Sequence, residues 1–289
     1  MLEEWLIAPF REFAFMRRAL VGVLALAIGA SPVGVFLMLR RMSLTGDAMA
    51  HAILPGAAVG FLFAGLNLGA MTIGGIIAGV AVALAAGAVA RSTVLREDAS
   101  LAAFYLISLS LGVLIVSTRG GTVDLMHVLF GTVLALDNPT LLLIASIASI
   151  SVVTLAILYR PLVMECVDPG YLRSVSGLSP IAHHAFLVLV VVNLVGGFHA
   201  LGTLMAVGIM IIPAAAARFW VRDIGLLIIL AIAIALVGGV IGLLASYHFA
   251  LPAGPAIILT LGIAYVASLV LGRDGLLRAR WPAHGHLDA

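Results

Sequence analysis

Leu44-Thr-Gly-Asp-Ala-Met-Ala-His-Ala-Ile-Leu-Pro-Gly56 is a stretch in which an acid and a histidine interrupt apolar sequence. No charged residue occurs in residues 19–39 on one side of it, or in residues 52–90 on the other. Asp47 and His51 stand four residues apart, so on a helix they share one face. Ionisable groups are costly inside a membrane, which makes such a pair a candidate functional site. A carboxylate and an imidazole together suit a divalent transition metal.

A structural interpretation of the same pair stays open, in which Asp47 and His51 lock two helices together by a hydrogen bond. The depth of Asp47 and His51 in the membrane favours the functional interpretation. At about 1.5 Å per residue from Arg41, the two side chains lie roughly 9–15 Å into an apolar core about 30 Å thick. Sites in transporters lie at such depths, and the Pro55-Gly56 break that follows frees backbone groups.

The composition is that of a polytopic membrane protein. Of the 289 residues 63% are hydrophobic and only 10% are charged, whereas a soluble domain carries about 25% charged residues. We therefore predict an all-α fold with about nine (eight to ten) transmembrane helices. The apolar runs that predict them, each near the ~20 residues a spanning helix needs and all free of charge except for Asp47, are 19–39, 44–66, 69–90, 99–118, 139–159, 182–198, 200–217, 224–247 and 252–272.

Charge and aromatic placement divides the chain into three parts. Residues 1–18 mix charged and aromatic side chains, which predicts an amphipathic helix lying in the membrane interface. Residues 19–272 form a single transmembrane domain, and residues 273–289 a cytoplasmic tail. With nine spans most arginines fall on one side, which is then the cytoplasm. The longest polar connection, about 160–180, lies on that side, and its apolar residues predict a docking partner.

The small residues indicate helix packing, and the absence of several motifs argues against some classes of function. Close helix packing in lipid uses small residues, so we expect packing roles for Gly74, Gly75, Gly79, Gly238, Gly239 and Gly242. The single cysteine, Cys166, excludes an internal disulfide and a cysteine-rich metal site. No P-loop, His-Glu-x-x-His or Gly-x-Ser-x-Gly motif occurs, which argues against ATP binding by a P-loop and against an enzyme.

Three further residues are weaker candidates for metal contacts. His127 follows Asp124 by three residues near the expected outer face, so the two share a helix face. His199 lies between two spans that glycines separate, facing the expected outer vestibule. All three would be secondary to Asp47 and His51.

The run Phe36-Leu-Met-Leu-Arg-Arg-Met-Ser-Leu-Thr-Gly-Asp-Ala-Met-Ala-His-Ala-Ile-Leu-Pro-Gly56 resembles the signature of the permease subunits of bacterial zinc and manganese ABC importers. Supporting matches occur at 129–134, 202–218 and 251–257, and the likeness covers about residues 15–272. It implies a type II-like ABC importer permease in the bacterial cytoplasmic (inner) membrane. It also implies that Asp47 and His51 are the metal ligands of the pathway.

The resemblance further implies an assembly. It consists of a homodimer of this chain in the lipid bilayer, two ATP-binding cassette subunits on the cytoplasmic face, and an extracytoplasmic metal-binding protein. The 160–180 region would hold the coupling helix that enters the ATPase. The coupling residues that we expect there are Glu165, Asp168, Tyr171, Arg173 and Gly177. No nucleic acid and no permanently bound cofactor are expected.

The transported ion is expected to be Zn²⁺, because imidazole leans toward zinc. Manganese or iron import by the same mechanism is the alternative, since one carboxylate and one imidazole suit these ions too. A permease for metal chelates would instead need a wide pathway that does not depend on Asp47 and His51. An ion-coupled secondary carrier would need no ATPase partner.

Overall fold

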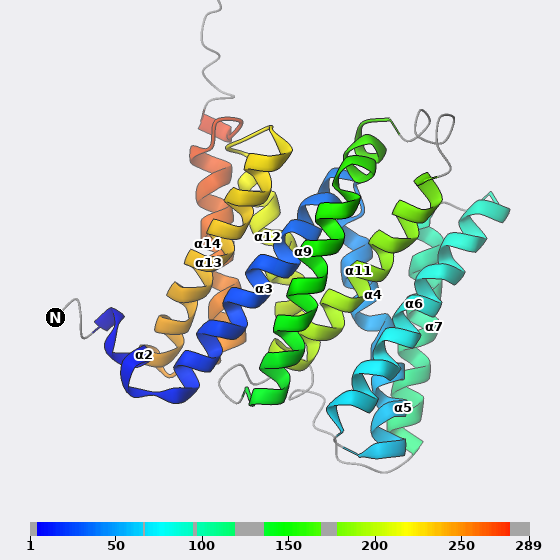
Figure 1. Ribbon diagram of the computed structural model, residues 1–289, viewed down its shortest axis with the longest axis horizontal. Coiled ribbons are helices and arrows are strands. Elements are labelled where there is room, and N and C mark those ends of the chain that lie inside the picture. The colour runs from blue at the N-terminus through cyan, green and yellow to red at the C-terminus, as the bar shows by residue number, and fades with distance from the viewer. Residues whose placement is uncertain (1–4, 66, 95–96, 119–135, 169–177, 278–289) are drawn as a thin grey trace, which may run out of the picture.

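The computed structural model describes residues 5–65, 67–94, 97–118, 136–168 and 178–277, and all regular structure within these ranges is helical (Figure 1). The helices are α2 (Ala8–Glu12), α3 (Ala14–Leu39), α4 (Ser43–Ala52), α5 (Leu54–Ala64), α6 (Leu68–Ser92), α7 (Glu97–Thr118), α9 (Asn138–Val167), α11 (Leu178–Leu201), α12 (Thr203–Arg218), α13 (Ile224–Phe249) and α14 (Ala253–Leu271).

The predicted all-α, polytopic fold is confirmed. In the described ranges seven segments are long and apolar enough to cross a membrane: α3, the α4–α5 pair, α6, α9, α11, α13 and α14. Two shorter apolar stretches, Ala99–Ile115 in α7 and Met205–Arg218 in α12, correspond to the remaining two predicted spans. The second predicted span, 44–66, is divided into two helices at Ile53.

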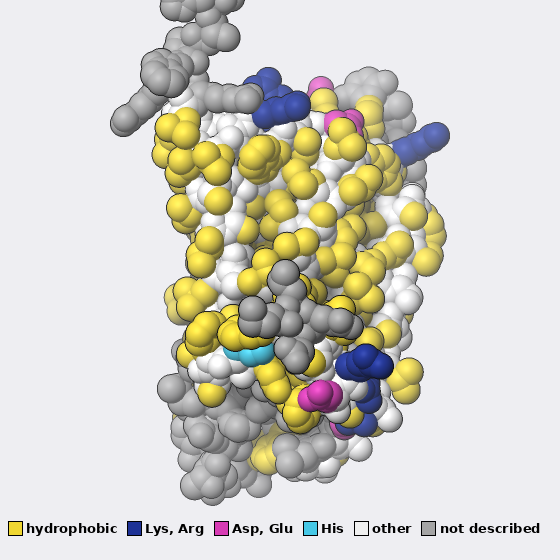
Figure 2. All heavy atoms as spheres, turned by 90° about the vertical axis from the view of Figure 1, so that its left-hand side faces the viewer, with side chains coloured by type: hydrophobic (Ala, Val, Ile, Leu, Met, Phe, Trp, Pro, Cys, Tyr) yellow, Lys and Arg dark blue, Asp and Glu magenta, His cyan; other side chains and the backbone are white. Residues whose placement is uncertain are grey.

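Charged side chains separate to the two ends of the bundle. Arg40, Arg218 and Arg222 lie at one end, which we call the arginine-rich end, where α3 and α12 finish and α13 begins. The N-terminal segment with Arg11 and Arg17 lies at the opposite end (Figure 1). Figure 2 shows charged side chains at both ends and a broad hydrophobic band between them, as expected of a surface in contact with lipid.

The N-terminal segment differs from the single interfacial helix expected over residues 1–18. Helix α2 is only five residues long, Phe13 is extended, and the first long helix already begins at Ala14. The segment is tied to the end of α13, where Trp5 stacks on His248 with ring centroids 4.1 Å apart. His248 Nε2 lies 3.0 Å from the Trp5 carbonyl oxygen, and Phe13 lies against Tyr247. These aromatic contacts pack the segment on both sides of the bend at Phe13 against the end of α13.

Helix α3 occupies the centre of the bundle, in contact with α9, α11, α12 and α13. Polar contacts join the core helices: Ser31 on α3 donates to the Ile209 carbonyl of α12 (3.2 Å), and Asn193 on α11 donates to Ser151 on α9 (2.7 Å). Buried polar groups in lipid need such partners, since no water is present to replace them.

Glycines bring helix backbones into direct contact. A Cβ added at Gly56 on α5 would lie 2.0 Å from the Gly74 carbonyl oxygen of α6, and one at Gly60 would lie 2.4 Å from the Ala70 carbonyl oxygen. The packing roles predicted from sequence are confirmed, because at each of the six positions an added Cβ would approach a neighbouring atom closer than 3.0 Å. Small residues at helix interfaces allow this approach in membranes.

The arginine-rich end is also tied by a surface ion pair between the α12–α13 turn and the end of α14. Arg222 Nη2 and Nε donate to the two carboxylate oxygens of Asp274 at 2.7 and 3.0 Å. The hydrogen bonds from Arg222 hold the pKa of the Asp274 carboxyl below its ordinary value. Asp223 accepts from the Leu226 N–H (2.9 Å) and so caps α13.

Replacement of Gly56 by alanine is expected to destabilise the protein by about 1–3 kcal/mol, because α5 and α6 have to separate to admit the methyl group. A lowered midpoint of thermal unfolding in detergent measures the effect. The matched control is Gly262→Ala on α14, where nothing lies within 4 Å of an added Cβ. Equal midpoints for both variants would contradict the close α5–α6 contact.

Candidate metal pathway

Helix α4 buries one face and presents Asp47 and His51 on the other. Its small and apolar side chains pack toward α7, α11 and α12. On the opposite face Leu44 is 85% exposed, and the side chains of Asp47 and His51 are 64% and 30% exposed. Figure 1 shows α4 at mid-height of the bundle, with α5 continuing toward the end opposite the arginine-rich one. Asp47 and His51 therefore belong to a segment, Ser43–Ala64, that is long and apolar enough to span a membrane.

Asp47 and His51 lie close together but do not form a hydrogen bond with each other. His51 Nε2 lies 3.9 Å from Asp47 Oδ1, which is beyond hydrogen-bond distance. Two ligands that bind one metal at about 2.1 Å lie roughly 3.0–3.4 Å apart, so a small side-chain shift brings both onto one ion. The ring of Tyr105 on α7 lies beside His51, with ring centroids 6.4 Å apart.

The helix break just after His51 has a clear cause. Residue 55 is proline, so the carbonyl of His51 loses the i+4 donor that a continuous helix would supply. Helix α7 supports the break from one side: Ser108 donates to the Ala52 carbonyl (3.0 Å), and Gly112 leaves room for the Pro55 ring. The α4–α5 boundary therefore lies two residues after His51.

In one copy of the chain, Asp47 and His51 have no third metal-ligating side chain beside them among the described residues. Among the described residues no group of three or more His, Cys, Asp or Glu side chains is placed to hold a metal ion. An acidic side chain that is 64% exposed in a candidate membrane-spanning segment is costly to leave against hydrocarbon. Water or another protein surface has to cover this face of α4.

The other residues predicted from sequence are placed as follows. Asp124, His127, Tyr171, Arg173 and Gly177 lie outside the described residues. His199 belongs to the last turn of α11. Asp168 is exposed at the C-terminal end of α9. Their predicted roles stay predictions.

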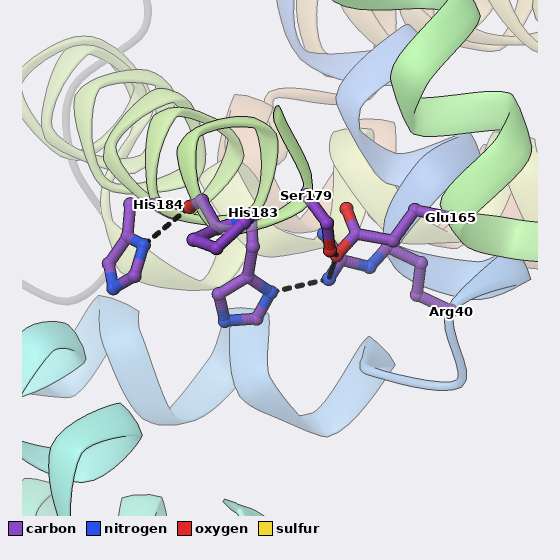
Figure 3. A network of polar contacts seen from close by, with 6 residues as sticks. Arg40, Glu165, Ser179, His183 and His184 are labelled. Carbon is purple, nitrogen blue, oxygen red and sulfur yellow. Dashed lines mark hydrogen bonds and ion pairs between the residues drawn. The ribbon is translucent and has the colours of Figure 1, made fainter. Parts of the chain in front are cut away.

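Glu165, which was predicted to contact the ATPase, has a buried side chain. Its side chain is only 4% exposed and lies 3.6 Å from Nη2 of Arg40, whose guanidinium stacks over Phe186 at 5.1 Å. The same Arg40 nitrogen donates to His183 on α11 (Figure 3). Sequence reasoning missed this network, although an arginine directly after a charge-free span was a signal of a buried or interfacial cation.

Comparison with known proteins identifies the family. The profile of the ABC 3 transport family matches residues 12–272. The chain belongs to the ABC 3 transport family. It is therefore a multi-pass permease subunit of an ABC importer and is not itself the ATPase, as the sequence predicted.

Several relatives of this ABC 3 family chain carry names that state a cargo. The manganese transport system membrane protein MntC of Listeria innocua is 31% identical over 267 residues, 92% of this chain and 94% of that protein. The manganese import system permease protein ScaB of Streptococcus parasanguinis is 28% identical over 92% of this chain and 93% of its own. A probable iron transport system membrane protein of Haemophilus influenzae is 29% identical over 93% and 98%.

Solved structures share the fold of this permease. PsaBC from Streptococcus pneumoniae, in complex with Fab, matches 97% of this chain and 100% of the matched chain with a TM-score of 0.85 and 27% identity. An inward-facing putative metal-chelate type ABC transporter matches 87% and 84% with a TM-score of 0.66 and 16% identity, which shows the fold alone. The type II-like importer fold predicted from sequence is confirmed.

Replacement of Pro55 by alanine is expected to straighten the α4–α5 segment, because the new N–H can donate to the His51 carbonyl. Spin labels at positions 44 and 63, which are 85% and 88% exposed, report the change in a Cys166→Ser background. Their separation should move toward the ~28 Å of a straight helix. An unchanged distance distribution, relative to a Pro252→Ala control, would contradict the proline as the cause of the break.

Proposed function

We propose that this permease imports Mn²⁺ across the cytoplasmic membrane, with Asp47 and His51 as ligands along the pathway. The observation that carries the proposal is a carboxylate and an imidazole 3.9 Å apart on the exposed face of α4. The names of the relatives support manganese, with iron as the second ion, and none of those described above names zinc. Manganese therefore replaces zinc as the favoured cargo.

The ligand set fits transient binding. One carboxylate and one imidazole replace part of the hydration shell of a divalent ion, while a full cage would hold it too tightly to release. Mn²⁺ binds most protein sites more weakly than the later transition metals. A pathway that gives few ligands thus passes Mn²⁺ easily, and the choice between metals falls to the protein that delivers the ion.

A homodimer accounts for the exposed carboxylate. A second copy facing α4 would cover Asp47 and bring its own Asp47 and His51 to the same pathway, giving four protein ligands in total. This arrangement meets the cost of a charge at membrane depth and completes a site that one copy leaves open.

Two ATPase subunits would bind at the arginine-rich end, which is the cytoplasmic end under the positive-inside rule. The segment around residues 160–180 is the proposed contact, with Asp168, Tyr171, Arg173 and Gly177 as its candidates. The absence of a P-loop in this chain means that ATP has to be hydrolysed by a partner. An extracytoplasmic metal-binding protein would deliver the ion to the other end.

Replacement of Asp47 or His51 by alanine is expected to lower Mn²⁺ uptake by at least about tenfold, which corresponds to roughly 1.4 kcal/mol of lost ion binding. Uptake of radioactive Mn²⁺ into cells that express the complete importer measures the effect. Asp137→Asn is the matched control, because it removes a carboxylate at the start of α9 and retains a capping side chain.

Wild-type uptake in both alanine variants would remove Asp47 and His51 from the pathway. Cargo is tested separately by the wild-type protein with Mn²⁺, Fe²⁺ and Zn²⁺ at equal concentration. Faster accumulation of Zn²⁺ than of Mn²⁺ would overturn the proposed cargo. Uptake that persists without an ATPase partner would point to a secondary carrier.

A further inference from the structure

At the arginine-rich end, the ends of α3, α9 and α11 meet in a buried polar network (Figure 3). Arg40 Nη2 lies 3.6 Å from Glu165 Oε1 and donates to Nδ1 of His183, which is the acceptor because a guanidinium only donates. Ser179 donates to the same Glu165 oxygen at 3.3 Å. The side chains of Arg40 and Glu165 are only 9% and 4% exposed, so the pair is shielded from water.

The network joins both flanks of the proposed coupling segment. Glu165 lies in the last turn of α9, just before that segment, and Ser179 and His183 lie at the start of α11, just after it. Residues 169–177 lie outside the described part of the chain. A displacement of either flank therefore acts on one guanidinium, that of Arg40.

Arg40 in turn is connected to α4 by a tight turn. Arg41 adopts a left-handed conformation (φ 58°), and the Met42 N–H donates to the Leu37 carbonyl at 2.8 Å, as in a Schellman helix end. Helix α4 starts at Ser43, only three residues after Arg40. Only Arg41 and Met42 separate Arg40 from α4, so a shift of Arg40 is transmitted directly to the helix that carries Asp47.

The ion pair is looser than a good arginine–carboxylate pair. At the same end of the bundle, Arg222 and Asp274 form two hydrogen bonds at 2.7 and 3.0 Å. In the buried network both contacts of Arg40 use Nη2, while its Nη1 and Glu165 Oε2 are buried and have no hydrogen-bond partner among the described residues. Unpaired buried polar atoms are costly, and a two-bond pairing of Arg40 with Glu165 would satisfy both.

We infer that Arg40 and Glu165 are positioning residues that couple the ATPase-facing segment to α4, and that their pair tightens when ATP binds. The inference rests on the proposed function only for the presence of an ATPase partner, not for the cargo. Movement of the α9 and α11 flanks draws Glu165 toward Nη1 of Arg40. The turn through Arg41 then transmits this shift to α4 and its metal ligands.

The experiment measures the accessibility of a cysteine on α4. In a Cys166→Ser background, Leu44→Cys places a thiol at an exposed position in the first turn of α4. The complex with its ATPase subunits, in lipid nanodiscs, is labelled with a maleimide with and without non-hydrolysable ATP. We expect ATP to change the labelling rate by at least about fivefold. In Glu165→Gln this change should be lost, although the ATPase subunits still co-purify.

Ser179→Ala is the second variant, and Arg222→Gln is its control. Ser179→Ala removes one tether of Glu165 and leaves both charges in place, so the protein folds while the ATP-dependent change becomes smaller. Arg222→Gln, which breaks the exposed pair at the same end, should retain the full change. A purely structural role would lower thermal stability in the network variants and leave the ATP-dependent ratio intact.

The inference is overturned if Glu165→Gln and Ser179→Ala both respond to ATP as the parent does, or if the parent itself does not respond. The readout requires no metal ion. Failure of Asp47→Ala to reduce Mn²⁺ uptake would therefore refute the proposed pathway without affecting this result, and the reverse also holds.

Discussion

Asp47 carries a carboxylate into a membrane-spanning segment, where insertion of a charge near the centre costs about 2.5–3.5 kcal/mol or more. This cost has to be recovered by the arrangement around α4. The buried face of the helix is made of small side chains that pack tightly against its neighbours, and only the face with Asp47 and His51 is left uncovered. Under the proposed function the same exposure leaves the carboxylate able to bind an ion, because a carboxylate with all its partners in place would have little affinity left for one.

The arginine-rich end holds two arginine–carboxylate pairs, one exposed and one buried. The exposed Arg222–Asp274 pair closes the α12–α13 and α14 ends and is well bonded. The buried pair of Arg40 and Glu165 is poorly bonded, although burial makes every missing contact more expensive. A buried pair of this kind contributes little net stability. We therefore interpret the Arg40–Glu165 pair as a link between the ends of three helices.

Sequence patterns predicted those parts of the structure that depend on neighbouring residues. The spans follow from the cost of charge in lipid, and the shared face of Asp47 and His51 follows from a spacing of four residues. The bend at Phe13 was not predictable in this way, because it depends on contacts of Trp5 and Phe13 with the distant end of α13. The network was hidden for the same reason, since Arg40 and His183 are 143 residues apart. Glu165 looked like a surface acid because its partner comes from another helix.

The backbone contact between Gly56 and Gly74 has a mechanical consequence. At this point the two helices touch through their main chains with no side-chain layer between them, so α5 cannot move closer to α6. A rotation of α4 relative to α5 would centre on Ile53, the residue between the two helices, near which Pro55 lacks the N–H that would bond the His51 carbonyl. The imidazole of His51 lies two residues from this pivot and the carboxylate of Asp47 lies six residues away, so the same rotation displaces the acid farther than the base.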